Sequence, residues 1–190
     1  ITTAGLMRYL KGPDFPTGGI VINKDELLNI YETGSGKIKI RGKVEFEQVK
    51  GGRTNVVITE IPYTMIGMNI SKFLSDVAGW VETKKTQDVV DISNQSSKEG
   101  IRIVIELRKD ADAENFVNLL YKKTRLEDTF GVNMLAISEG RPEVMGLKAV
   151  LRACVEFQFQ IATRKYTNLL AKEMERKEVQ EGLIKACNVI

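Results

Sequence analysis

The chain has 190 residues, of which 43% are hydrophobic and 28% charged, with a net charge of only +3 and no histidine. This composition fits one large domain or one and a half small ones, and no run approaches the roughly 18 apolar residues that a membrane span requires. The missing histidine excludes Ser-His-Asp and Cys-His catalysis and disfavours most zinc and non-haem iron sites. Any nucleic-acid partner must be argued from local charge, because the total charge is small.

Neither end of the chain carries the signals of a natural terminus. Residue 1 is not methionine, the first residues are not a signal peptide, and no helix stop precedes Ile190. We therefore expect a fragment of a longer protein. Cys154 and Cys187 lie 33 residues apart in one predicted helix, a separation of about 50 Å that excludes a bond between them. The lack of a disulfide framework predicts a cytoplasmic protein.

The clearest local signal is the strict alternation of charged and apolar residues from Lys37 to Glu47, which predicts one continuous strand. Before it, Asn23 is the expected cap of a helix whose inward residues are Leu27, Leu28 and Tyr31. The elements predicted up to Pro62 are a helix end (3–11), a strand (20–22), a helix (24–33), the long strand (37–47), a turn (50–53) and a second strand (55–61) that forms a hairpin with the first.

The residues after Pro62 alternate between helical and strand patterns. Phe73, Trp80 and Phe116 recur at helical spacing, so we expect them in the core rather than stacked on bases. The pattern predicts an α+β fold, with a mostly antiparallel sheet and helices packed on it. The predicted elements are a helix (70–83), a strand (89–92), a polar loop (93–100), a strand (101–107), a helix from Asp110 or Asp112 to Tyr121, and a strand (133–137).

From Leu147 onward there is no proline and only one glycine, Gly182. This predicts a helix of up to about 44 residues, roughly 65 Å long. Such a helix is too long to be buried in a body of this size, so it should project as an arm that pairs with a partner helix. Expected i,i+4 ion pairs are Glu173 with Lys177 and Glu181 with Lys185. Phe157 and Phe159 face different sides, so at least one should meet another module.

Several short runs occur in a fixed order. They are Lys11–Gly19 (KGPDFPTGG), Tyr31–Gly34 (YETG), Lys37–Lys43 (KIKIRGK), Thr59–Tyr63 (TEIPY), Arg102–Leu107 (RIVIEL), Thr129–Ala136 (TFGVNMLA) and, in the long helix, Glu181–Leu183 (EGL). Together they resemble the DNA-cleaving A subunit of bacterial type II topoisomerases, that is, of DNA gyrase or topoisomerase IV. The resemblance covers essentially the whole chain but does not separate the two enzymes, which differ in a C-terminal DNA-wrapping region.

The resemblance implies three parts: a connector from a winged-helix module (1–19), a tower domain (20–142) and the first arm of an exit-gate coiled coil (143–190). In this family a tyrosine hydroxyl attacks the DNA phosphate, and the partner B subunit holds Mg²⁺ and ATP in an A2B2 assembly. That tyrosine lies upstream of the Lys11–Gly19 run, so the resemblance implies no catalytic residue, metal or cofactor within these residues. Arg8-Tyr9 matches the family's Arg-Tyr pair only superficially, and we expect Tyr9 to be a core or helix-end residue.

The best functional candidates are the cations on the long strand. Lys37, Lys39, Arg41 and Lys43 occupy every second position, about 6.6 Å apart, a spacing comparable to that of phosphates along DNA. Residues 36–53 contain six basic and two acidic side chains, so we expect Arg53 to contribute as well. Such a face would hold duplex DNA through phosphate contacts, without reading its sequence. The alternative is the solvated outer face of an antiparallel sheet.

The connector is a second candidate site, of a different kind. Pro13, Asp14, Pro16, Gly18 and Gly19 predict a rigid turn, and the run lacks the spacing of a nucleotide-binding loop. No acidic cluster suggests a magnesium site, and the charges at Asp110, Asp112 and Glu114 are typical of a helix start.

Two function classes follow. The first is a non-catalytic, DNA-supporting segment of a topoisomerase whose partners are duplex DNA, the remainder of its own polypeptide and the B subunit, without a membrane. The second is a protein-interaction scaffold that uses the long helix. A stand-alone enzyme is disfavoured because no nucleophile constellation is present.

Overall fold

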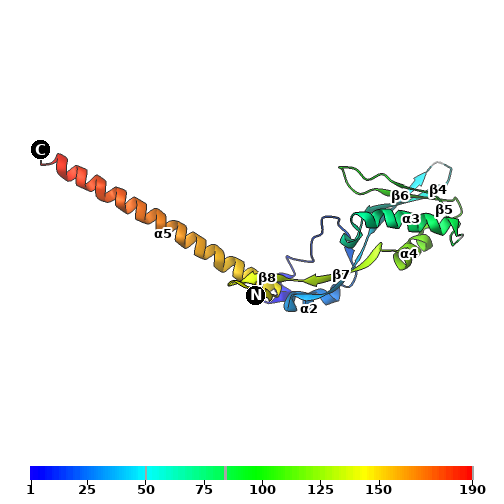
Figure 1. Cartoon of the computed structure of the whole chain (residues 1–190), viewed down its shortest axis with the longest axis horizontal. Helices are drawn as coiled ribbons and strands as arrows, with labels where there is room; N and C mark the ends of the chain where they lie inside the picture. Colours follow the sequence, from blue (N-terminus) through cyan, green and yellow to red (C-terminus); the bar gives the residue numbers. More distant parts are fainter. Residues whose placement is uncertain (50, 84, 190) are drawn as a thin grey trace.

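The computed structural model describes residues 1–49, 51–83 and 85–189. It consists of an α+β body and one long helix that leaves it (Figure 1), as the sequence predicts. The elements are α1 (Thr3–Leu6), β1 (Ile20–Val21), a 3-10 turn (Lys24–Glu26), α2 (Leu27–Thr33), β2 (Ser35–Arg41), β3 (Lys43–Val49), β4 (Arg53–Glu60), a second 3-10 turn (Tyr63–Met65), α3 (Met68–Glu82), β5 (Val89–Asn94), β6 (Ile103–Leu107), α4 (Ala113–Lys123), β7 (Glu127–Asn133), β8 (Leu135–Ser138), β9 (Arg141–Val144) and α5 (Leu147–Cys187).

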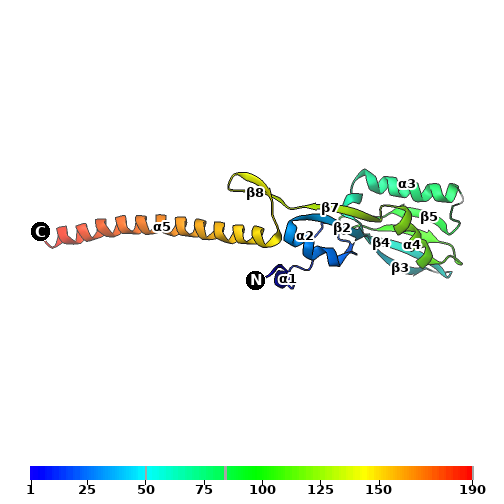
Figure 2. The same cartoon turned by 90° about the horizontal axis from the view of Figure 1, so that it is seen from below.

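The main core lies between a four-stranded sheet and two helices. The strands are antiparallel in the order β3-β4-β6-β5, and α3 and α4 pack on the sheet (Figure 2). Alternate residues of β4 and β6 point into this core, where they meet Phe73 of α3 and Phe116 of α4. Trp80 packs against the same cluster and is partly buried. The predicted core role of these three aromatic residues is therefore confirmed.

A second, smaller sheet has the strand order β1-β2-β7, and its strands are also antiparallel. Helix α2 covers one face, where Leu27 and Ile30 pack against Ile38 and Ile40. The expectation that Leu28 faces inward is wrong, because its side chain is exposed. The helix buries residues 27, 30 and 31, which share a face at i, i+3 and i+4, and residue 28 lies outside that stripe.

The single strand predicted over 37–47 is wrong, because the chain changes sheets at Gly42. Residues up to Arg41 pair with β7, whereas residues from Lys43 pair with β4. The Gly42 N–H donates to the Leu126 carbonyl (2.8 Å) and its carbonyl accepts from the Tyr121 hydroxyl (3.0 Å). A Cβ at residue 42 would lie 2.5 Å from a Leu126 methyl group and 2.7 Å from the Glu60 carbonyl oxygen, so only glycine fits this crossing.

The predicted hairpin of β3 and β4 is confirmed, with Val49 opposite Arg53 next to its turn. Lys50, which we assigned to that turn, lies outside the described residues. The helix predicted over 3–11 ends already at Leu6.

The strand predicted over 133–137 corresponds to two separate strands. β7 runs from Glu127 to Asn133 and pairs along its whole length with β2. β8 then forms a two-stranded hairpin with β9, and no strand was predicted for the residues of β9. The hairpin has only two strands, so a proline that lacks an N–H can be accommodated on its open edge.

The projecting helix is confirmed. α5 has 41 residues and none of them is buried. Its start contacts α1 and α2, and the remainder extends away from the body (Figure 1). Cys154 and Cys187 are free and exposed. The observed ion pairs are Arg176 with Glu173 and Lys177 with Glu181, rather than the two that were predicted. Among the residues that the structure describes, no helix is long and apolar enough to cross a membrane.

Candidate nucleic-acid interface

The open face of β2 presents two lysines to solvent. Lys37 and Lys39 alternate with the buried Ile38 and Ile40. Asn23 holds the strand from the side: its amide donates to the Lys37 carbonyl (3.0 Å) and its carbonyl oxygen accepts from the Lys39 N–H (2.7 Å). Neither lysine forms an ion pair with any described residue. Both ammonium groups are therefore available to an anionic partner.

The strand next to these lysines carries small side chains. Thr129 of β7 lies directly opposite Lys39, and Gly131 lies opposite Lys37. Residues directly opposite in an antiparallel pair project from the same face. Apart from Gly131 itself and its two chain neighbours, no atom of the described residues lies within 4 Å of where a Gly131 Cβ would be. The face around the two lysines is therefore low and open.

Arg41, the third residue of the predicted row, is engaged within the protein. Its Nε and Nη2 atoms lie 2.9 and 2.6 Å from Glu127 Oε2, and its guanidinium lies 4.3 Å from the centre of the Tyr121 ring. Burial raises the pKa of Tyr121, and the positive charge of Arg41 opposes that rise. Arg41 thus ties β2 to β7 and α4, close to the point where the chain changes sheets.

The last two predicted cations belong to the other sheet. Lys43 of β3 is paired with Glu45, with 3.1 Å between Nζ and Oε1, and this hydrogen bond raises the pKa of Lys43. Arg53 is exposed at the start of β4. The five predicted residues therefore comprise two unpaired lysines on β2, two paired cations near Gly42, and one exposed arginine at a distant strand end.

The net charge counted for residues 36–53 leaves out charged partners that the fold brings close to them. Glu127 faces Arg41 from 86 residues away. Arg102 of the β5–β6 segment forms two hydrogen bonds with the carboxylate of Glu47, at 2.9 and 2.8 Å. The latter pair lowers the pKa of Glu47. No local signal in the sequence points to either pair, because each joins segments that are remote along the chain.

The connector is fixed to the body by its glycines. Gly18 and Gly19 have φ angles of +69° and +105°, which favour glycine. The Gly19 N–H donates to the Glu60 carboxylate, and a Cβ on Gly18 would collide with that same group. Because the carboxylate already occupies this N–H, the turn is a poor cradle for phosphate.

Aromatic side chains also hold the connector against the body. The Phe15 ring lies 5.1 Å from that of Phe130 and 6.0 Å from that of Tyr63, measured between centroids. Pro13 is half-buried, while Asp14 and Pro16 are exposed. Phe15 thereby holds this run against Phe130 of β7 and Tyr63 of the second 3-10 turn.

The remaining sequence candidates carry no evident chemistry. Tyr9 follows the end of α1 and is 87% exposed, so the core alternative suggested for it is wrong. Within residues 1–49, 51–83 and 85–189, no three His, Cys, Asp or Glu side chains are grouped so that they could hold a metal ion.

The family of the DNA gyrase/topoisomerase IV A subunits matches residues 2–190. The DNA gyrase A subunit of Clostridium acetobutylicum is 43% identical over 182 residues, which are 96% of this chain and 22% of that protein. The DNA topoisomerase 4 A subunit of Bacillus subtilis is 41% identical over 185 residues, 97% of this chain and 23% of that protein. The chain thus spans less than a quarter of these relatives, and both enzyme types match almost equally well.

Proposed function

The chain belongs to the family of DNA gyrase/topoisomerase IV A subunits, and we propose that it is a non-catalytic, DNA-supporting segment of a type II topoisomerase. In this proposal residues 20–142 are the tower domain and α5 is the first arm of a coiled coil. The whole enzyme would be a cytoplasmic A2B2 assembly that changes DNA topology with ATP and Mg²⁺ held by the B subunit. The segment alone would bind DNA without cutting it.

The observation that carries the proposal is the pair of unpaired lysines on the open face of β2. Their Cα atoms are about 6.6 Å apart, because they are two residues apart in a strand. Neighbouring phosphates of one DNA strand have a comparable spacing, and the small side chains of Thr129 and Gly131 leave room for the backbone of a duplex. Contacts of this kind are sensitive to salt and independent of base sequence.

The contributions of the other cations should be smaller. Arg41 and Lys43 would have to leave Glu127 and Glu45 before they could bind phosphate. We therefore propose Lys37 and Lys39 as the principal contacts, with Arg41, Lys43 and Arg53 as secondary ones.

The test is duplex binding by the double variant Lys37→Glu/Lys39→Glu, measured by fluorescence anisotropy at several salt concentrations. The matched control is Lys98→Glu/Lys172→Glu, which changes the net charge equally, from +3 to −1, at exposed positions elsewhere. Losing two phosphate contacts should reduce the slope of log K against log salt by about 1.8. Equal weakening in both variants would mean a general charge effect, and unchanged binding in the β2 variant would disprove the proposed face.

A second candidate function rests on α5. Large apolar side chains are exposed along this helix, among them Phe159, Tyr166 and Leu170. A scaffold that works through these residues should self-associate or bind a partner helix without binding DNA. Sedimentation velocity of the chain and of Leu170→Glu tests this function. Association that Leu170→Glu abolishes, together with no duplex binding at low salt, would favour the scaffold over the DNA-supporting segment.

A further inference from the structure

The end of α4 adjoins the face of β2 that we propose for DNA. Arg41 projects from the same face of this strand as Lys37 and Lys39, because side chains alternate along a strand. Its guanidinium lies 4.3 Å from the centre of the Tyr121 ring, and Tyr121 belongs to the last turn of α4. The last turn of α4 therefore lies at the edge of the open face of β2.

Three exposed cations lie in this last turn or directly after it. Lys122 and Lys123 are the basic residues of the last turn, and Arg125 lies two positions beyond the helix. Thr124, the residue that ends α4, has an extended backbone, and its hydroxyl donates to the Leu120 carbonyl (2.6 Å). This hydrogen bond fixes the backbone at the point where the chain leaves the helix, between the second and third cations.

Arg125 is close to the lysines of β2. Thr129 of β7 lies directly opposite Lys39, and Arg125 precedes Thr129 by four residues. Four residues span at most about 14 Å, and opposite residues of an antiparallel pair are about 5 Å apart. The Cα atoms of Lys39 and Arg125 therefore lie within about 20 Å of each other, the length of roughly six base pairs of a duplex.

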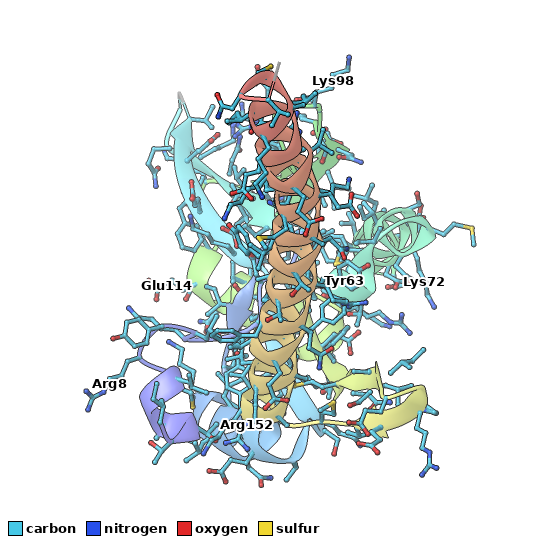
Figure 3. All side chains as sticks on the ribbon, turned by 90° about the vertical axis from the view of Figure 1, so that its left-hand side faces the viewer. Arg8, Tyr63, Lys72, Lys98, Glu114 and Arg152 are labelled. Atoms are coloured by element: carbon cyan, nitrogen blue, oxygen red, sulfur yellow. The ribbon has the colours of Figure 1, made fainter. Side chains whose placement is uncertain are left out.

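A fourth cation, Lys72 of α3, converges on the same place. A small cavity of about 130 Å³ lies between α3 and the end of α4, and Lys72, Lys123 and Arg125 all line it. Figure 3 labels Lys72 on the outer side of α3. The lining includes one carboxylate, that of Asp76. Its formal charge is therefore +2, from three cations and one anion.

These cations have no anionic partners within the described part of the chain. None of the four forms an ion pair there. The carboxylates at the start of β7 are engaged elsewhere: Glu127 is bound by Arg41, and Asp128 accepts from the Thr64 hydroxyl (2.7 Å). The positive charge between α3 and α4 is therefore available to a partner.

Helix dipoles account for only part of this group. Lys122 and Lys123 lie at the negative end of α4, where cations are favoured. Arg125 lies beyond that helix, and Lys72 is the fifth residue of α3, close to its positive end. The dipoles of α3 and α4 therefore give no reason for cations at these two positions.

We propose that Lys72, Lys123 and Arg125 form a second phosphate-binding surface, which takes the backbone of the same duplex that binds to β2. This inference rests on the proposed function. The two surfaces adjoin one another through Arg41 and Tyr121, and both carry cations without partners among the described residues. A continuous positive surface complements the closely spaced charges of duplex DNA. Lysine and arginine contacts to phosphate would hold the duplex in place without reading its bases.

The test is the binding of a duplex of about 20 base pairs, longer than the separation of the two surfaces, to Lys123→Gln/Arg125→Gln. Fluorescence anisotropy at salt concentrations from about 50 to 200 mM should show the slope of log K against log salt reduced by about 1.8. This fourfold rise in salt should weaken binding by the parent about twelvefold more than binding by the variant. The matched control Lys98→Gln/Lys172→Gln removes the same charge at exposed positions elsewhere and should keep the parent slope.

The inference is overturned if Lys123→Gln/Arg125→Gln keeps the parent slope, or if the control variant lowers it equally. Lys72→Gln changes only α3 and should by itself reduce the slope by about 0.9, so the test holds even if the double variant perturbs the end of α4. A reduced slope in Lys37→Glu/Lys39→Glu alone would leave the proposed function standing without this second surface. A reduced slope in Lys123→Gln/Arg125→Gln alone would support this surface and disprove the face on β2. A parent chain that binds no duplex would refute both.

Discussion

Replacing Arg41 by alanine should destabilise the fold, whereas the same replacement at Lys39 should leave it intact. The two residues occupy equivalent positions in the alternating strand, yet only Arg41 has partners within the protein. Its guanidinium contacts the carboxylate of Glu127 and the ring of Tyr121. The side chain of Lys39 is exposed, without an ion pair to any described residue.

The expected loss follows from these contacts. The side chains of Arg41 and Glu127 are 37% and 28% exposed, so solvent screening limits their ion pair to roughly 0.5–1 kcal/mol. The cation–π contact contributes about 0.5–1 kcal/mol more. Arg41→Ala should therefore lose about 1–2 kcal/mol of unfolding free energy, a fall in Tm of roughly 2–8 °C for a chain of this size. Lys39→Ala should stay within about 0.5 kcal/mol of the parent.

Urea unfolding followed by the fluorescence of Trp80 measures this difference. Trp80 is the only tryptophan and packs against the main core, so its signal reports the body rather than the projecting helix. A double-mutant cycle with Glu127→Ala isolates the ion-pair term. If Arg41→Ala were as stable as the parent and lost duplex affinity as strongly as Lys39→Ala, Arg41 would face DNA and this assignment would be refuted.

Three further predictions concern stability. Gly42→Ala should lower the unfolding free energy by about 1–3 kcal/mol, because its Cβ collides with the Glu60 carbonyl and the Leu126 side chain. Gly131→Ala should cost much less in the same urea assay, because among the described residues its Cβ meets no atom within 4 Å beyond its chain neighbours. Ile105→Ala should cost about 2–5 kcal/mol, because Ile105 is fully buried in the main core; a loss below about 1 kcal/mol would place it outside the cooperative core. Arg102 lowers the pKa of Glu47 through a side-chain hydrogen bond. Their ion pair should therefore contribute fully to the unfolding free energy at pH values above the pKa of an unfolded glutamate, about 4.3. This contribution should be lost as the pH falls through the lower pKa that Glu47 has in the folded state. The stability difference between the parent and Glu47→Gln should then shrink only on the acid side, and a difference that is constant with pH would contradict the pairing.

The secondary structure of several segments, and the side of each that is buried, could be predicted from the sequence because both depend on residues that are close together along the chain. The absence of proline after Leu147 favours a continuous helix, and the projecting α5 is the result. The helical spacing of Phe73 and Phe116 indicates a buried stripe, and both are in the core. The alternation around Ile38 and Ile40 correctly predicts which side of β2 is buried. The ordered motifs identify the family, which residues 2–190 match.

Only the tertiary structure decided which strands pair and which charges are free. Alternation continues unbroken through Gly42, yet β2 and β3 find different partners, and those partners lie far apart along the chain. For the same reason Arg41 pairs with Glu127 and is not one of the row of free cations that the sequence predicts. A side-chain pattern reports the conformation of its own segment, whereas hydrogen-bond ladders, ion pairs and cavities depend on which segment packs alongside it.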